Sequence, residues 1–216
     1  MKSNFKKQTW SINTKGTPTI IKNCSKCGKQ CEFINSGNFR VNANHKMLDV
    51  WLIYQCKKCN TTWNMEILSR TNAKSIDETS YKMFLENNKD LAEKYAFDIN
   101  TLSKNKAVVD FSSVSYQIQE DITNSILAEE GLEVTIQCKF QIDVRLDKII
   151  SEKLNISREE VKKMCQNGLI LSDSNNNIGK VKVKDGITFQ ILGNAIADKI
   201  DNSSQLEEYN TLAVNH

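Results

Sequence analysis

The sequence predicts an α+β fold built from three consecutive parts, and three patterns lead to this prediction. Near the N-terminus, two pairs of cysteines enclose a segment rich in aromatic and β-branched residues, which is typical of strands. In the middle, apolar residues recur at helical spacing and are followed by segments of alternating polarity. Near the C-terminus, two short helical patterns precede alternating strand patterns. We therefore expect a ribbon of strands, a helical middle with strands, and a small αα-β module.

The first residues of the chain are basic. The only proline, Pro18, lies just before the first cysteine pair. We predict that residues 1–20 form a basic arm whose Trp10 packs back onto the ribbon. Within the ribbon, Asp49 to Gln55 alternate in polarity and predict a strand that leads directly into Cys56.

Two Cys-x-x-Cys turns predict a zinc site. Each turn can deliver two sulfur ligands to one ion, and each is followed by a residue that tolerates positive φ, Gly28 in the first and Asn60 in the second. The 28 residues between the pairs are enough for a hairpin that returns the second pair to the first. This predicts a zinc ribbon over residues 21–75 with one structural Zn²⁺ whose ligands are Cys24, Cys27, Cys56 and Cys59.

Two other residues compete for a place in this site. Cys31 lies shortly after the first pair and could replace a ligand, although a partly buried thiol is the simpler interpretation. His45 could bind a metal, but its neighbours Asn44 and Lys46 suggest a turn. Four protein ligands close the zinc shell and leave no position for a reactive water, so the metal is expected to stabilise structure.

The middle region, residues 76–142, begins with a helix signal. Ser75 and Glu78 have the spacing of a capping box, and the following helical stripe is interrupted at Asn87 and Asn88. Alternating residues then predict two strands, at 114–118 and at 134–142.

The last module, residues 143–192, begins with a helix after Arg145. Ser157 and Glu160 form a second capping-box pattern, Gly168 follows the second helix, and strands flank the Asp185-Gly186 turn. Residues 193–216 form an acidic, polar tail.

This C-terminal segment resembles the RNA-binding module named after ribosomal small-subunit protein four. The likeness rests on Arg145-Leu-Asp-Lys148, Ser157-Arg158, Asn167-Gly168 and Lys184-Asp-Gly-Ile187. In that family, the helix pair presents basic residues to the backbone of structured RNA. The resemblance implies that the RNA-binding positions here are Arg145, Lys148, Ser157, Arg158 and Lys162.

A second resemblance covers most of the chain. The first cysteine pair, the segment Leu48 to Tyr54, Thr62-Trp63-Asn64 and Arg145 to Lys148 are similar to a bacterial zinc-ribbon family designated domain of unknown function 1062. This resemblance implies that ribbon, middle and C-terminal module belong together, and it implies no activity.

The amino-acid composition indicates a folded protein and argues against a membrane protein. Of 216 residues, 39% are hydrophobic and 25% charged, which favours a folded chain. There is no apolar run long enough for a membrane helix and no secretory signal, so we expect a cytoplasmic protein with reduced thiols and no membrane partner. Residues 1–75 carry 13 basic and 3 acidic groups, which favours an acidic partner.

The motifs favour binding over catalysis. The sequence has two histidines, no glycine-rich phosphate loop and no nucleophile elbow, so we expect no enzymatic activity. Two hypotheses remain. In the first, the protein binds structured RNA and a ribosomal particle is a candidate location. In the second, the ribbon is an adaptor that docks onto another protein without RNA binding. The sequence does not decide the oligomeric state.

Overall fold

The fold was analysed in a computed structural model that describes residues 5–120, 131–172 and 178–193. The predicted acidic tail lies outside these residues except for Gly193. The chain forms two compact units: unit 1 comprises residues 1–13 and 117–216, and unit 2 comprises residues 14–116. The boundaries fall within the strands β1 (Lys6–Lys15) and β7 (Ser115–Glu120).

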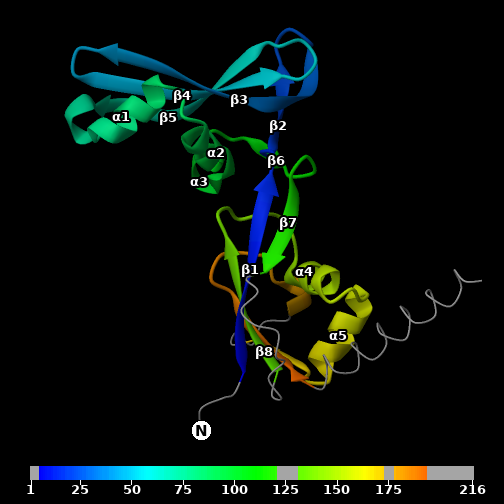
Figure 1. The fold of residues 1–216 in the computed structure, drawn as a ribbon. Coiled ribbons are helices and arrows are strands. Elements are labelled where there is room, and N and C mark those ends of the chain that lie inside the picture. Colours follow the sequence, from blue (N-terminus) through cyan, green and yellow to red (C-terminus); the bar gives the residue numbers. More distant parts are fainter. Residues whose placement is uncertain (1–4, 121–130, 173–177, 194–216) are drawn as a thin grey trace, which may run out of the picture. The chain divides into compact units, whose positions relative to one another are not determined.

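Unit 2 contains a five-stranded sheet in the order β5-β4-β3-β2-β6 (Figure 1). All of its neighbouring strands are antiparallel. The strands are β2 (Thr19–Cys24), β3 (Lys29–Asn44), β4 (Met47–Cys56), β5 (Thr62–Asn72) and β6 (Val108–Asp110). Between β5 and β6 lie η1 (Ala73–Ser75), α1 (Glu78–Leu85), α2 (Lys89–Phe97) and α3 (Ile99–Lys104).

The core of unit 2 lies between this sheet and the helices. Phe39 from β3 meets Phe84 from α1 edge to face, with ring centroids 5.1 Å apart. Leu48, Val50, Leu52 and Tyr54 alternate along β4 and are fully buried, so the predicted strand 49–55 is confirmed. Because successive side chains of a strand point to opposite faces, these four residues share one face of β4, which packs against the helices.

Helix boundaries in unit 2 follow local capping chemistry. The predicted break at Asn87 and Asn88 is confirmed, because Asn87 has φ of +53° and Asn88 caps α2 through the backbone N–H of Leu91. The predicted capping box at Ser75 is wrong. Asp77 caps α1 instead by accepting a hydrogen bond from the Ser80 N–H.

Unit 1 contains a second five-stranded sheet, in the order β7-β1-β8-β10-β9. Strand β8 (Gly131–Cys138) pairs in parallel with β1 and antiparallel with β10 (Thr188–Leu192), which also pairs with β9 (Ile170–Ser172). The described residues of this unit also form the helices α4 (Leu146–Lys153) and α5 (Arg158–Gln166) and the short 3-10 helix η2 (Ile178–Lys180). The predicted capping box of Ser157 and Glu160 is confirmed at the start of α5.

The predicted three-part architecture is wrong. Strands dominate the described residues and form two sheets, in place of an N-terminal zinc ribbon, a helical middle and a separate αα-β RNA-binding-like module. The middle region 76–142 is divided between both units, and residues 143–192 share their sheet with β1.

The basic arm 1–20 is also corrected. Residues 6–15 form β1, and Trp10 is 1% exposed. Trp10 packs against Phe189 in unit 1, with ring centroids 5.6 Å apart, and does not pack onto the cysteine-bearing strands. The prediction failed because β1 pairs with β8 more than 100 residues later, and local periodicity carries no signal for such a pairing.

Candidate functional site

The four predicted ligand cysteines converge at one end of unit 2. Cys24 ends β2 and Cys56 ends β4, while Cys27 and Cys59 lie in the turns that follow. The antiparallel pairing of β3 with β4 brings the two turns together. The resulting set of thiols, whose sulfur atoms all lie within 4.8 Å of one another, is Cys24, Cys27, Cys56 and Cys59.

Matching backbone bonds shape both turns. The Gly28 N–H donates to the Cys24 carbonyl at 2.9 Å, and the Asn60 N–H donates to the Cys56 carbonyl at 2.8 Å. Gly28 has φ of +66° and Asn60 has φ of +60°, so each closes its turn in the left-handed region that Gly and Asn tolerate best. The two turns therefore share the same closing hydrogen bond and the same left-handed residue after the second cysteine.

The second turn is also fixed to β3. The Lys57 N–H donates to the Glu32 carbonyl at 2.9 Å, and the Lys57 ammonium lies 2.8 Å from the Glu32 carboxylate. These bonds hold the Cys56 turn against the strand that leads away from the Cys24 turn.

The sulfur geometry fits a tetrahedral metal site. Zn–S bonds of about 2.3 Å place the sulfurs of a tetrathiolate site about 3.8 Å apart. The Cys24 and Cys59 sulfurs are 3.5 Å apart, far longer than a disulfide bond, and all seven cysteines are free thiols. These four residues therefore lie close enough to hold one metal ion.

The electrostatics of the site favour thiolates at the second turn. The hydroxyl of Thr61, whose oxygen lies 3.2 Å from the Cys59 sulfur, and the Thr61 N–H lower the pKa of Cys59 to about 6. Burial alone would raise the pKa of Cys56, but the N–H groups of Lys58 and Cys59 point at its sulfur and lower it overall. The pKa of Cys27 is raised, chiefly by its hydrogen bond to Cys59. A central cation would allow all four sulfurs to ionise together.

The two rival ligands take different places. Cys31, on β3, is half-buried, and burial raises the pKa of its thiol; it is outside the four-thiol set. His45 lies in the turn between β3 and β4 with φ of +53° and is exposed, which fits the turn prediction. Sequence reasoning missed Thr61, which only the folded turn brings to Cys59.

The predicted RNA-binding residues gather around the start of α4 and α5. Arg145 precedes α4, and Lys148 lies in its first turn, 3.6 Å from Glu152. Arg158 begins α5, and Lys162 lies one turn later, 3.8 Å from Glu159. Ser157 uses its hydroxyl to cap α5 through the Glu160 N–H. Ser157 therefore has a structural role that explains its presence.

An ion pair joins the two helices. Arg158 donates from Nε at 3.1 Å and from Nη2 at 2.6 Å to the same oxygen of Asp147, whose side chain is 12% exposed. This pair brings α5 beside the first turn of α4 and so connects the two basic pairs. The contact also means that Arg158 has a structural role besides any contact with a partner.

We expect Arg158→Ala to destabilise unit 1 by about 1 to 2 kcal/mol, because it leaves the buried Asp147 carboxylate unpaired while the half-exposed arginine limits the loss. Lys162→Ala, the matched control, should change stability by at most about 0.5 kcal/mol because its ion pair is exposed. Urea unfolding of both variants measures the difference. Equal midpoints would show that the Asp147 contact contributes nothing.

The comparisons with known proteins place the chain in a family. A family model described as Protein of unknown function (DUF1062) matches residues 41–176, more than half of the chain. The chain belongs to the DUF1062 family. Comparison with curated proteins and with solved structures gave no match. The DUF1062 match includes Cys56, Cys59 and both helices α4 and α5, and it begins after the first cysteine pair.

The structure also bears on the membrane prediction. Among the described residues, no helix combines the length and the apolar character that crossing a bilayer requires.

Proposed function

We propose that this chain is a non-enzymatic protein that binds structured RNA through the starts of α4 and α5, and that one structural zinc ion stabilises unit 2. The proposal of RNA binding rests on the ion pair between Arg158 and the buried Asp147, which brings the basic residues of α4 and α5 together. The observation that carries the zinc part is the convergence of four thiols from two matched turns.

Zinc is the metal that suits this donor set best. Thiolates are soft ligands and select zinc over magnesium or calcium, which prefer oxygen. Four sulfurs complete a tetrahedral shell, so a bound zinc would have no open position for substrate or water. The ion would therefore stabilise the two turns and the sheet that carries them.

The α4–α5 surface suits a phosphate backbone. Structured RNA is recognised mostly through its shape, phosphates and ribose hydroxyls, which favours rigidly held Arg and Lys. Asp147 fixes the orientation of Arg158, while the side chain of Arg158 stays 48% exposed and keeps N–H groups that can reach a partner. Among the described residues, Arg145 is exposed and has no ion pair, so its charge is available.

The acidic neighbours do not argue against this function. Lys148 and Lys162 are paired with exposed glutamates at 3.6 Å and 3.8 Å. Such surface pairs contribute about 0 to 1 kcal/mol, so a phosphate could replace the glutamate at little cost.

The test is the salt dependence of binding to a hairpin RNA. Arg145→Ala/Lys148→Ala should weaken binding and reduce the slope of log K against log salt by about 2, since two phosphate contacts are lost. The matched control is Lys74→Ala/Lys89→Ala, two exposed lysines on the helical side of unit 2. Fluorescence anisotropy of a labelled hairpin measures both quantities.

Two results would contradict the proposal. One is a wild-type protein that binds no structured RNA, and the other is an Arg145→Ala/Lys148→Ala variant that binds like the control. In either case, the adaptor hypothesis becomes the better one, and proteins that copurify with the chain become the next object of study.

A further inference from the structure

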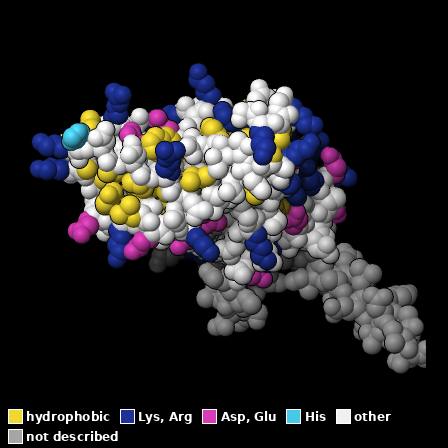
Figure 2. Space-filling view, turned by 90° about the horizontal axis from the view of Figure 1, so that it is seen from above, with side chains coloured by type: hydrophobic (Ala, Val, Ile, Leu, Met, Phe, Trp, Pro, Cys, Tyr) yellow, Lys and Arg dark blue, Asp and Glu magenta, His cyan; other side chains and the backbone are white. Residues whose placement is uncertain are grey.

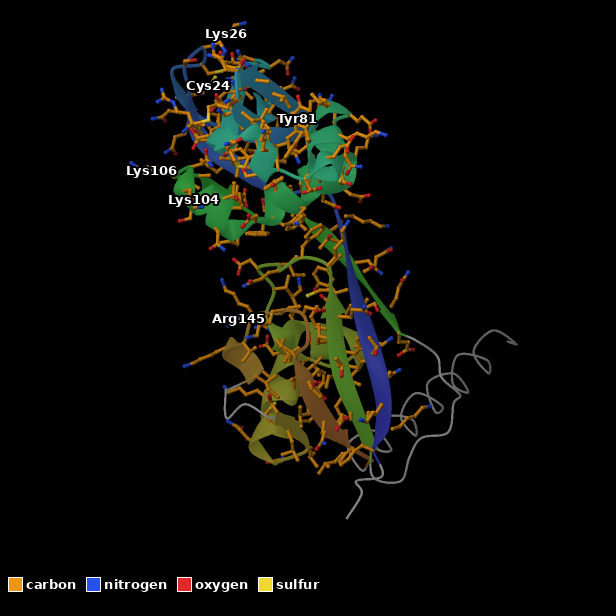
Figure 3. The ribbon with its side chains drawn as sticks, turned by 90° about the vertical axis from the view of Figure 1, so that its left-hand side faces the viewer. Cys24, Lys26, Tyr81, Lys104, Lys106 and Arg145 are labelled. Carbon is orange, nitrogen blue, oxygen red and sulfur yellow. The ribbon has the colours of Figure 1, made fainter. Side chains whose placement is uncertain are left out.

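Five lysines lie within or beside the two cysteine turns of unit 2. One lies in β2, two lie in the turns and one begins β3 opposite Cys24, while the last lies just before β6, the strand that pairs with β2. We call these residues the metal-end lysines: Lys22, Lys26, Lys29, Lys58 and Lys106. Figure 2 shows Lys and Arg side chains gathering at the right-hand end of the displayed face, and in Figure 3 Lys26 and Lys106 project outward on the side of unit 2 that carries Cys24.

The positive charge of the metal-end lysines exceeds the negative charge that four thiolates around a divalent ion would carry. Among the residues that the structure describes, none of the metal-end lysines has an ion pair, and the nearby Lys57 is neutralised by Glu32. Four thiolates around a divalent ion carry a net charge of about −2, which the lysines would partly offset. Five lysines leave an excess of about three positive charges. This excess is free to attract a polyanion.

An aromatic ring lies among these cations. The Lys22 ammonium is 4.8 Å from the centroid of the Trp63 ring, and Trp63 is partly exposed. The ring packs against the fully buried Tyr54, with centroids 5.5 Å apart, so it is held in place from one side. Surfaces that bind single-stranded nucleic acid combine such a ring, on which a base can stack, with lysines that contact the backbone.

We propose that the metal-end lysines and Trp63 bind a single-stranded segment flanking the structured RNA that contacts α4 and α5. This inference rests on the proposed function, and it adds a second surface with a different RNA conformation. The five lysines come from both turns, from β2, from the start of β3 and from the residues before β6, so they are spread over several segments of the chain. A flexible strand can follow them, and any base can stack on the Trp63 ring once it displaces the Lys22 ammonium that lies over it.

The experiment compares a blunt hairpin RNA with the same hairpin extended by a uridine tail of about 16 nucleotides, the upper range of such single-strand sites. Wild-type protein should bind the tailed RNA more tightly. Lys26→Ala/Lys29→Ala/Lys58→Ala should lose this gain and reduce the salt slope for the tailed RNA by about 2, with unchanged binding of the blunt hairpin. The matched control, Lys46→Ala/Lys74→Ala/Lys89→Ala, removes three exposed lysines away from the turns and should keep the gain.

A second variant distinguishes a loss of RNA contact from a loss of the metal ion. Lys22→Ala/Lys106→Ala changes no residue inside the two turns and should also reduce the gain from the tail. The zinc content of each variant is measured beside its binding. If both variants lose zinc faster to a chelator yet keep the full gain, the lysines serve only the metal site and the inference is overturned.

The same RNAs separate this inference from the proposed function. Arg145→Ala/Lys148→Ala should weaken binding of both RNAs by the same factor and keep the gain from the tail. If no protein binds the blunt hairpin while the isolated uridine strand still binds through the metal-end lysines, the proposed function fails and the single-strand surface stands. A wild-type protein that binds both hairpins equally overturns the inference.

Discussion

Replacing Cys56 and Cys59 together by serine is expected to unfold unit 2 and to leave unit 1 folded. Apparent binding energies of structural zinc reach about 10 to 16 kcal/mol in small zinc-finger peptides, which is comparable to the whole stability of an ordinary domain. The two turns fix the ends of β2 and β4, so their loss removes an anchor from the central strands of the sheet. A strong chelator should have the same effect on the wild-type protein.

Hydrogen exchange resolved by peptide measures this outcome. Amides of β2 to β5 should lose protection in the double variant, while those of β8, β10 and α4 should keep it. Cys31→Ser is the matched control, because it removes a thiol next to the site but outside the four-thiol set. Retained protection of β2 to β5 in the double variant would show that the metal does not hold this unit.

The second large effect is expected at the start of the chain, where Trp10→Ala should destabilise unit 1 by about 3 to 5 kcal/mol. Trp10 is buried, faces Ile136 in the parallel pairing of β1 with β8, and packs edge to face on Phe189. Its removal leaves a large cavity between the sheet strands and their covering side chains.

Chemical denaturation of unit 1, followed by exchange of β8 and β10 amides, measures the cost. Trp51→Ala is the control, since Trp51 is a partly exposed tryptophan of unit 2 and its loss should leave those amides unchanged. An effect below about 1 kcal/mol for Trp10→Ala would mean that residues 6–15 do behave as a loose arm.

The four-thiol set was predictable because each of its turns is specified by neighbouring residues. A Cys-x-x-Cys turn needs only four residues and a following position that accepts positive φ, and Gly28 and Asn60 supply that position in the sequence. The strand 49–55 and the capping box of Ser157 were predictable for the same reason, since each depends on neighbours within a few residues.

The division of the chain between the two units was not predictable from these local patterns. In the sequence, nearly all of unit 2 lies between β1 and β8, and the segment Lys6–Lys15 carries only Trp10 and Ile12 as apolar residues. The pairing of β1 with β8 and the packing of Trp10 on Phe189 join residues far apart in the sequence, and local periodicity carries no information about such contacts.

The candidate RNA surface could be predicted from the sequence only in part. Helical spacing predicts the basic pairs of α4 and α5. The sequence does not show that Arg158 contacts Asp147, eleven positions earlier in the chain. That contact changes the experiment, because Arg158 now affects stability as well as any binding. Arg145 and Lys148 are the better probes of RNA contact.

Native mass spectrometry of the wild-type chain, purified without chelator, measures whether the four-thiol set holds a zinc ion. We expect one zinc ion per chain in the wild type and in Cys31→Ser, and none in Cys56→Ser/Cys59→Ser. A wild-type chain that carries no zinc, or a double variant that keeps a full zinc ion, would contradict it.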